Sequence, residues 1–62
     1  MTATVTMKNG RTDVISGLDV RVVSNKYTVS VLWAEKPWYA EGLYVDRKKS
    51  YDADMVESVV VS

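Results

Sequence analysis

Hydrophobic and polar residues alternate most regularly in residues 2–16. Ala3, Val5 and Met7 are separated by threonines, and a period of two places these three side chains on one face of a strand. The run ends at Asn9-Gly10, the strongest short signal for a hairpin, because both central residues of a type I′ turn need a positive φ. The stretch therefore predicts a β-hairpin with one buried and one hydrated face.

The predicted two-residue turn also sets the register of this hairpin. It places Val5 opposite Val14 and Thr4 opposite Ile15. Residues that lie opposite each other in a sheet share a face. We therefore expect Val14 to extend the buried face and Ile15 to lie among the threonines, on a face that is itself partly covered.

Further short strands follow the hairpin. Gly17 suits a turn or a bulge, residues 20–24 predict a third strand, and Asn25-Lys26 predicts a second tight turn. Residues 27–34 alternate over the longest distance, which favours a long and central fourth strand. Trp33 falls on the buried face of that strand.

Pro37 interrupts the alternation, because proline fixes φ and cannot donate a hydrogen bond to a β-ladder. We expect a loop at this point. A fifth strand is expected over residues 39–46, kinked near Gly42. The charged residues 46–50 then predict an exposed turn.

The C-terminal part combines an acidic stretch with a run of valines. Residues 52–57 allow one helical turn, in which Asp54 and Glu57 have the spacing of a capping box. The same acidic side chains lack the glycine of an EF-hand loop, so we expect no metal site. Residues 59–61 show no polar alternation, which predicts a final strand buried on both faces.

Residues 17–24 and 55–62 show an internal similarity. Each segment follows a predicted hairpin, carries an acidic residue at its third position and ends in Val-Val-Ser. Two interpretations stay open: two hairpin-plus-strand halves, or a chance match between valine-rich strands.

Together these elements predict one all-β domain over residues 1–62. Its architecture is a small antiparallel barrel or curled sheet of roughly five or six short strands, with room for one helical turn near Asp54. A chain of 62 residues without cysteine has a marginal core and no disulfide to support it. Open sheet edges invite pairing with another copy, so we expect a homodimer or higher oligomer. A monomer held together by its aromatic rings is the alternative.

Composition excludes several function classes. Eight basic and eight acidic residues cancel, so no overall field attracts the chain to nucleic acid or to a membrane. There is no membrane-spanning apolar run and no signal peptide, from which we expect a cytoplasmic location. Without histidine or cysteine the commonest general base and nucleophile are missing, and the glycines form no phosphate-binding loop. We therefore expect neither an enzyme nor a cofactor.

Two clusters are candidate binding sites. Trp38, Tyr39 and Tyr44 are candidate anchors for a protein partner, since aromatic residues dominate interface energetics; packing in the core is their alternative role. A second cluster could contact the backbone of single-stranded nucleic acid while the same rings stack on its bases; a solvated turn is the alternative for its basic run. The residues of this second cluster are Lys36, Arg47, Lys48 and Lys49.

The Lys8-Asn-Gly10 turn and the Val56-Glu-Ser-Val-Val-Val61 strand resemble a group of short proteins encoded by bacteriophages and prophages, mostly without assigned function. The resemblance implies an accessory role in which the protein binds and diverts a host protein, in the host cytoplasm. The segment Lys36-Pro-Trp-Tyr39 departs from that group, and no functional residue is carried over from it.

These observations favour a protein–protein interaction module, encoded by a phage and acting as a homo-oligomer. The alternative is a small β-barrel that binds single-stranded nucleic acid, and a component of a self-assembling particle is a third hypothesis. Salt separates the first two, because only binding to nucleic acid weakens steeply as the salt concentration rises.

Overall fold

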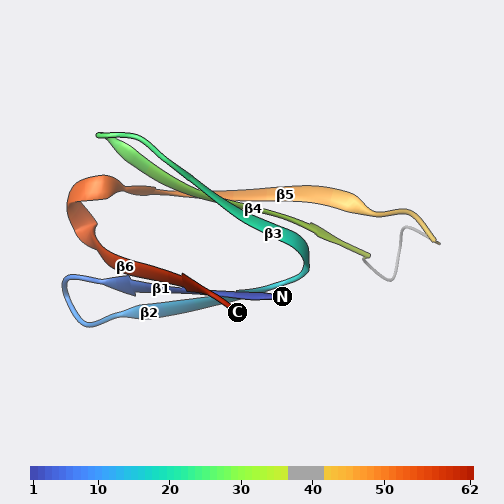
Figure 1. The fold of residues 1–62 in the computed structure, drawn as a ribbon, viewed down its shortest axis with the longest axis horizontal. Coiled ribbons are helices and arrows are strands. Elements are labelled where there is room, and N and C mark those ends of the chain that lie inside the picture. The colour runs from blue at the N-terminus through green and yellow to red at the C-terminus, as the bar shows by residue number, and fades with distance from the viewer. Residues whose placement is uncertain (37–41) are drawn as a thin grey trace.

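The computed structural model describes residues 1–36 and 42–62, which form two antiparallel sheets of three strands each (Figure 1). Sheet A has the strand order β2-β1-β6, and sheet B has the order β3-β4-β5. This confirms the predicted all-β antiparallel fold. The elements are β1 (Thr2–Met7), β2 (Thr12–Ser16), β3 (Leu18–Ser24), β4 (Thr28–Glu35), β5 (Val45–Asp52), the short 3-10 helix η2 (Ala53–Met55) and β6 (Val56–Val61).

Each half of the chain contributes a hairpin to one sheet and a third strand to the other. The hairpin β1–β2 lies in sheet A, and the chain then crosses through Gly17 to β3 in sheet B. The hairpin β4–β5 lies in sheet B, and the chain crosses back through η2 to β6 in sheet A. Because β6 pairs with β1 and β3 pairs with β4, the two halves have the same connectivity.

The internal sequence similarity does not follow this symmetry residue by residue. Aligning residues 17–24 with residues 55–62 equates Arg21 with Val59. Val59 lies opposite Val5 and faces the interior, whereas Arg21 lies opposite Leu32 on the outer face of sheet B. The two halves therefore share a topology, but the Val-Val-Ser match places its residues on opposite faces.

The predicted register of the first hairpin is wrong by one residue. Gly10 N–H donates to the Met7 carbonyl at 3.0 Å, Met7 N–H donates to the Arg11 carbonyl at 2.7 Å, and Gly10 has a φ of 89°. This is a three-residue loop, a type I turn closed by a glycine in the left-handed region, rather than a two-residue turn. A slip of one residue exchanges the faces of the returning strand. Ile15 is therefore buried opposite Ala3, and Val14 is 64% exposed opposite Thr4.

The second hairpin turns one residue later than predicted. The Asn25 side chain accepts hydrogen bonds from the backbone N–H groups of Tyr27 and Thr28, both at 2.8 Å, so Asn25 begins the turn. Its central residues are Lys26 and Tyr27, and Tyr27 is exposed on the turn rather than in a strand. The strand that follows, β4, is the central strand of sheet B, as predicted.

The prediction of the fifth strand over residues 39–46 and of a charged turn over 46–50 is wrong. Residues 39–41 lie outside the described part of the chain, and β5 runs through the charged residues instead. The strand tolerates its charges because it is an edge strand, where charged side chains reach solvent or partners on other strands. Lys49 reaches Asp13, and Arg47 reaches Glu35.

The C-terminal predictions are partly confirmed. The helical turn exists as η2, but its N-cap is Asp52, which makes no side-chain capping hydrogen bond, so the capping box led by Asp54 is wrong. β6 is an edge strand paired with β1, and Val60 and Val61 are exposed to 60% and 38%. The expected burial on both faces is therefore wrong, because β6 lies at the edge of sheet A and no described element covers its outer face.

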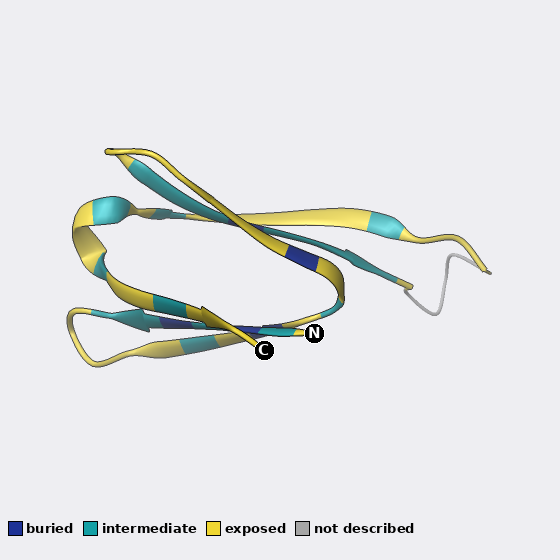
Figure 2. Cartoon of the chain, in the orientation of Figure 1, coloured by how far each residue is buried: buried dark blue, intermediate teal, exposed yellow. Residues whose placement is uncertain are grey.

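The hydrophobic core lies between the two sheets and is small (Figure 2). Its buried side chains come from four strands, and partly buried residues, among them Trp33, pack against them. Gly17 lies at the crossing between the sheets, where a Cβ atom would be 2.5 Å from Cδ1 of Trp33. The buried residues are Ala3, Val5, Ile15, Val20 and Val31.

Candidate interaction surface

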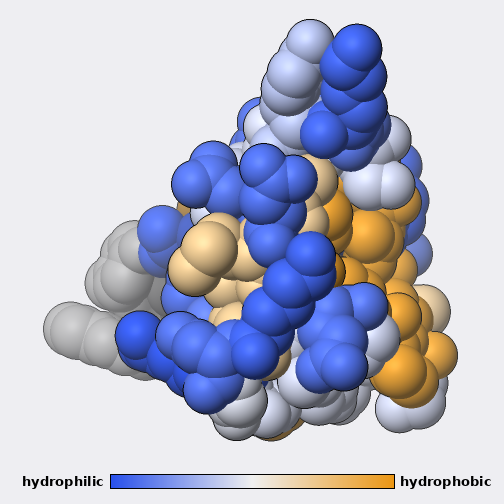
Figure 3. All heavy atoms as spheres, turned by 90° about the vertical axis from the view of Figure 1, so that its left-hand side faces the viewer, coloured by the Kyte–Doolittle hydropathy of each residue, from blue (hydrophilic) through white to orange (hydrophobic). Residues whose placement is uncertain are grey.

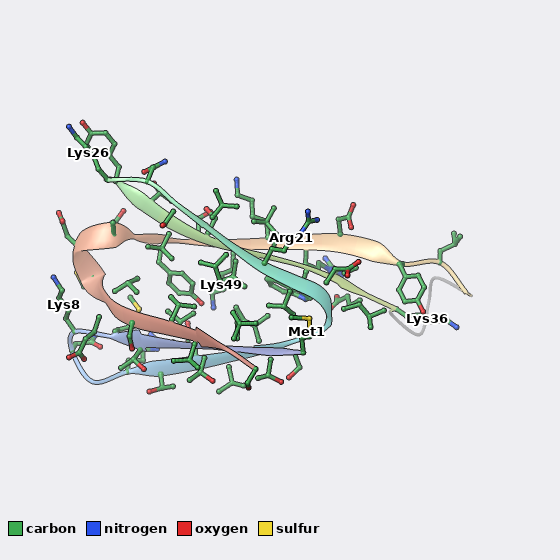
Figure 4. All side chains as sticks on the ribbon, viewed as in Figure 1. Met1, Lys8, Arg21, Lys26, Lys36 and Lys49 are labelled. Carbon is green, nitrogen blue, oxygen red and sulfur yellow. The ribbon has the colours of Figure 1, made fainter. Side chains whose placement is uncertain are left out.

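The two sheets meet along two long sides, and a polar bridge closes the side formed by β2 and β5. Asp13 lies opposite Val5 and therefore faces the interior of the sandwich. Its Oδ2 accepts a hydrogen bond from the Tyr51 hydroxyl at 3.0 Å and from Nζ of Lys49 at 3.3 Å. Lys49 lies between the two sheets in Figure 4. We call this side, with Asp13, Lys49 and Tyr51, the closed seam.

The hydrogen bonds of the closed seam shift the pKa values of its side chains. The Tyr51 hydroxyl, and then the Lys49 ammonium group, hold the pKa of Asp13 below its ordinary value of 3.8. The bond to Asp13 raises the pKa of Lys49, and burial raises the pKa of Tyr51. The folded state thus favours a charged Asp13, a charged Lys49 and a neutral Tyr51, which is the protonation that the bridge requires.

The opposite side of the sandwich, formed by β3 and β6, has no such bridge among the described residues. Val22 lies opposite Val31 and Val61 lies opposite Ala3, so both valines face the interior. They are nevertheless 36% and 38% exposed, because none of the described strands covers this side. Figure 3 shows hydrophobic side chains gathered on the side of the molecule where β3 and β6 lie. We call this side, with Val22, Val59 and Val61, the open seam.

The backbone of the open seam is also available for pairing. Ser62 exchanges hydrogen bonds with Thr2 of β1, and Asn25 N–H donates to the Thr28 carbonyl beside β4. Because the hydrogen-bonding direction alternates along an antiparallel strand, the backbone groups of every second residue point away from the sheet. Within the described chain no strand pairs with these edges. The residues whose backbone groups point away from their sheets are Val22 and Ser24 on β3, and Val59 and Val61 on β6.

Few charges interrupt the open seam. β3 carries Asp19 and Arg21, β6 carries Glu57, and their remaining residues are apolar or serine. Arg21 lies opposite Leu32, on the outer face of sheet B rather than in the seam. The open seam therefore combines two backbone edges that are unpaired in the described chain with valines that are partly exposed, a combination that a further strand can cover.

Two of the three aromatic anchors predicted from the sequence, Trp38 and Tyr39, lie outside the described residues. Tyr44 precedes β5 and is 59% exposed, next to Leu43 at 69%. Both residues come directly before β5, whose first residues lie at one end of the molecule (Figure 1). Tyr44 is thus a surface residue, but it does not belong to the open seam.

The predicted basic cluster is divided between the two faces of β5. Arg47 Nε lies 2.7 Å from Glu35 Oε1, and Lys49 is bound to Asp13. Lys48 points to the outer face of sheet B, where it lines a shallow hollow with Leu32 and Ser50. Lys36 follows the end of β4 (Figure 4). These four residues do not form one continuous basic surface.

Sequence reasoning missed the open seam, although a signal for it was present. The runs Val22-Val23 and Val59-Val60-Val61 lack polar alternation, and the second run predicts a strand buried on both faces. The same pattern arises where a strand lies at an exposed edge and carries valines on both faces. Only the strand order distinguishes a strand that is buried on both faces from a valine-rich strand at an exposed edge.

Comparison with known proteins adds no relative. No protein-family model matches the chain, and no similarity was found to a curated protein or to a solved structure. Within residues 1–36 and 42–62, no helix is long and apolar enough to cross a membrane. In the same residues no acidic side chains converge into a group that could hold a metal ion.

Proposed function

We propose that this protein is a protein–protein interaction module, acting as a homo-oligomer, that binds a strand of a partner protein along its open seam. The observation that carries the proposal is that the inward-facing Val22 and Val61 are about one-third exposed beside unpaired backbone edges. Exposed apolar surface next to a free sheet edge is a recurrent site of strand addition.

The seam also indicates the chemistry of the partner. Strand addition derives affinity from backbone hydrogen bonds and specificity from alternate side chains that enter the groove. The groove here is lined by valine side chains, so the fitting partner is an extended segment with small apolar residues at alternate positions. A polyanion would gain little at this surface, because the seam carries no cluster of cations.

The biological setting of the proposal rests on the sequence resemblance alone. An accessory protein of a phage would meet its partner in the host cytoplasm and divert it from its normal role. The exposed Tyr44 supplies a second candidate contact for the same partner, and Trp38 and Tyr39 stay candidates from the sequence.

Capture of proteins from a bacterial lysate tests whether the open seam binds a partner. The immobilised wild-type protein is compared with two matched variants. Val22→Lys places a charge in the open seam, whereas Val23→Lys places it on the next residue, which is 61% exposed on the outer face of sheet B. We expect the wild type and Val23→Lys to capture the same protein and Val22→Lys to lose it. Circular dichroism and thermal unfolding establish that both variants are folded.

Two outcomes would overturn the proposal. Equal capture by both variants would place the partner elsewhere on the chain. Capture that is lost between low and moderate salt, or after nuclease treatment, would favour the nucleic-acid alternative, with Lys36 and Lys48 as the residues to substitute next.

A further inference from the structure

On the outer face of sheet A, none of the outward positions that pair across the described strands carries a charged residue. The outward positions follow from the pairing, because Val5 and Ala3 face the core and their neighbours face out. All of these paired outward residues are threonine, serine or valine, although charged residues make up 26% of the chain. They are Thr2, Thr4 and Thr6 on β1, Thr12, Val14 and Ser16 on β2, and Ser58, Val60 and Ser62 beside them on β6. Glu57 of β6 is exposed but lies at the bulge between Val56 and Ser58 and has no partner on β1.

The outer face of sheet B shows that the lack of charge is not a general property of this fold. Its outward positions include Arg21, Asp46, Lys48 and Asp52. This face is hollowed, with a volume of about 360 Å³ lined mostly by polar side chains. Such a charged and hydrated face is typical of surface that stays in contact with water. An uncharged face is typical of the core of an interface, where charged residues are depleted.

The residues on the outer face of sheet A are arranged symmetrically about β1. Three rows cross the sheet, and in each row the residues on β2 and β6 match in kind. The central row has Val14 and Val60 on either side of Thr4, and these valines are 64% and 60% exposed. The other rows are Ser16, Thr2, Ser62 and Thr12, Thr6, Ser58.

From this pattern we infer that the outer face of sheet A is the surface through which two copies of the chain associate. A two-fold axis parallel to β1 places β2 of one copy over β6 of the other. Val14 of each copy then packs on Val60 of the second copy, and Thr4 lies close to its own equivalent. The inference names the self-association surface of the homo-oligomer, so it rests on that part of the proposed function.

The chemistry of this face suits a second copy better than another partner. Hydroxyl groups both donate and accept hydrogen bonds, so a row of threonines and serines is complementary to itself. A net charge of zero produces no repulsion between copies. A standard interface buries roughly 800 Å² on each partner, which is about a sixth of the 4517 Å² that this chain exposes. Stacking on this face also leaves the open seam free for a partner strand.

Light scattering on a size-exclusion column tests the inference with a matched pair of variants. Thr4 and Ser30 are outward residues on the central strands of sheets A and B. We expect the wild type and Ser30→Lys to be dimers at high protein concentration and Thr4→Lys to be a monomer. A monomeric wild type, or a dimeric Thr4→Lys, overturns the inference. The two results also separate this surface from the seam, because Val22→Lys is expected to lose its partner and keep the dimer.

A charge-pair experiment covers the case in which Thr4→Lys fails to fold. Val14→Glu and Val60→Lys are substitutions at exposed positions, and each alone is expected to weaken the dimer at least tenfold. If Val14 packs on Val60 of the second copy, the double variant forms two ion pairs across the interface and regains most of the lost affinity. Dimers that are weakened additively in the double variant would contradict the proposed two-fold arrangement.

Discussion

The two seams of the sandwich are formed in the same way by edge strands, but polar side chains line one of them and valine side chains line the other. Each joins an edge strand of sheet A to an edge strand of sheet B. In the closed seam, Asp13 of β2 binds Lys49 and Tyr51 of β5 with hydrogen bonds. In the open seam, Val22 and Val61 face the interior, but no described residue covers them fully and their side chains stay partly exposed. The difference is that polar contacts within the chain complete one seam, whereas the other leaves its valine side chains accessible in the described chain.

The comparison also explains how an interior-facing carboxylate is tolerated in so small a protein. A buried polar group costs free energy unless it is hydrogen-bonded. Asp13 is only partly buried and has two donors on the opposite sheet, so it joins the sheets instead of weakening them. The valines of the open seam make no such directional contacts, and their exposure to water is unfavourable until another surface covers them.

The largest effect is expected from the core that both seams share. Val31 has no exposed surface and packs among residues of both sheets. Val31→Ala removes buried methyl groups and leaves a cavity, which should lower the free energy of unfolding by about 2–3 kcal/mol. The control Val23→Ala, on the exposed face of sheet B, should lower it by less than about 0.5 kcal/mol. Urea unfolding measures both, and equal losses would show that the core lies elsewhere.

A smaller loss is expected where the chain crosses between the sheets. A Cβ atom at Gly17 would lie 2.5 Å from Trp33 Cδ1 and 2.9 Å from the Ala34 carbonyl oxygen. Because a backbone atom cannot move aside cheaply, Gly17→Ala should cost about 1–3 kcal/mol of stability. Ser16→Ala, at the exposed neighbouring position, is the control. A stable Gly17→Ala variant with unchanged Trp33 fluorescence would contradict the close approach of the two sheets.

The closed seam should give the protein a characteristic pH dependence. The lowered pKa of Asp13 means that its contribution is present above pH 4 and is lost as the pH falls through its folded value. The raised pKa values of Lys49 and Tyr51 mean that their contributions are present below about pH 10 and are lost as the pH rises further. The free energy of unfolding should therefore be highest between about pH 5 and pH 9.

Asp13→Asn assigns that pH dependence to the closed seam. The variant should be less stable than the wild type at neutral pH, and the difference should shrink as the pH falls below about 4, where the wild-type carboxylate is protonated. Urea unfolding at about pH 3 and pH 7 measures the difference. A constant difference across this range would show that the charge of Asp13 does not support the seam.

The smallest effect on folding is expected in the open seam. Val22→Thr replaces one methyl group with a hydroxyl group that solvent can reach, so stability should change by less than about 1 kcal/mol. Binding of the captured partner should nevertheless weaken, because the hydroxyl group loses water when a strand covers it. Calorimetric titration of the captured protein measures this effect. Unchanged affinity would remove Val22 from the interface.

The sequence was sufficient for the class of fold and for most of its elements, because local patterns determine both. Alternation identified the hairpin and the central strand of sheet B, and the acidic stretch identified the turn at η2. The register of the first hairpin depends on whether its loop has two or three residues. Asn9-Gly10 suits both a two-residue and a three-residue loop, and the burial of Ile15 decides between them.

The charged strand β5 and the open seam could not be predicted from local patterns. The charges of Lys49 and Arg47 look like a solvated turn until Asp13 and Glu35 are placed beside them, and these partners lie 36 and 12 residues away in the chain. Val22 and Val61 likewise read as ordinary core residues. Their exposure follows from the strand order, which leaves β3 and β6 at the edges.

The exposure of the open seam is the central claim, and the valine methyl groups report on it directly. We would measure their NMR relaxation in the wild-type protein while a soluble paramagnetic agent is added. The methyl signals of Val22 and Val61 should broaden strongly, whereas those of Val5 and Val31, which have no exposed surface, should not. If Val22 and Val61 were as protected as Val31, the seam would be closed in solution and would not be the binding surface.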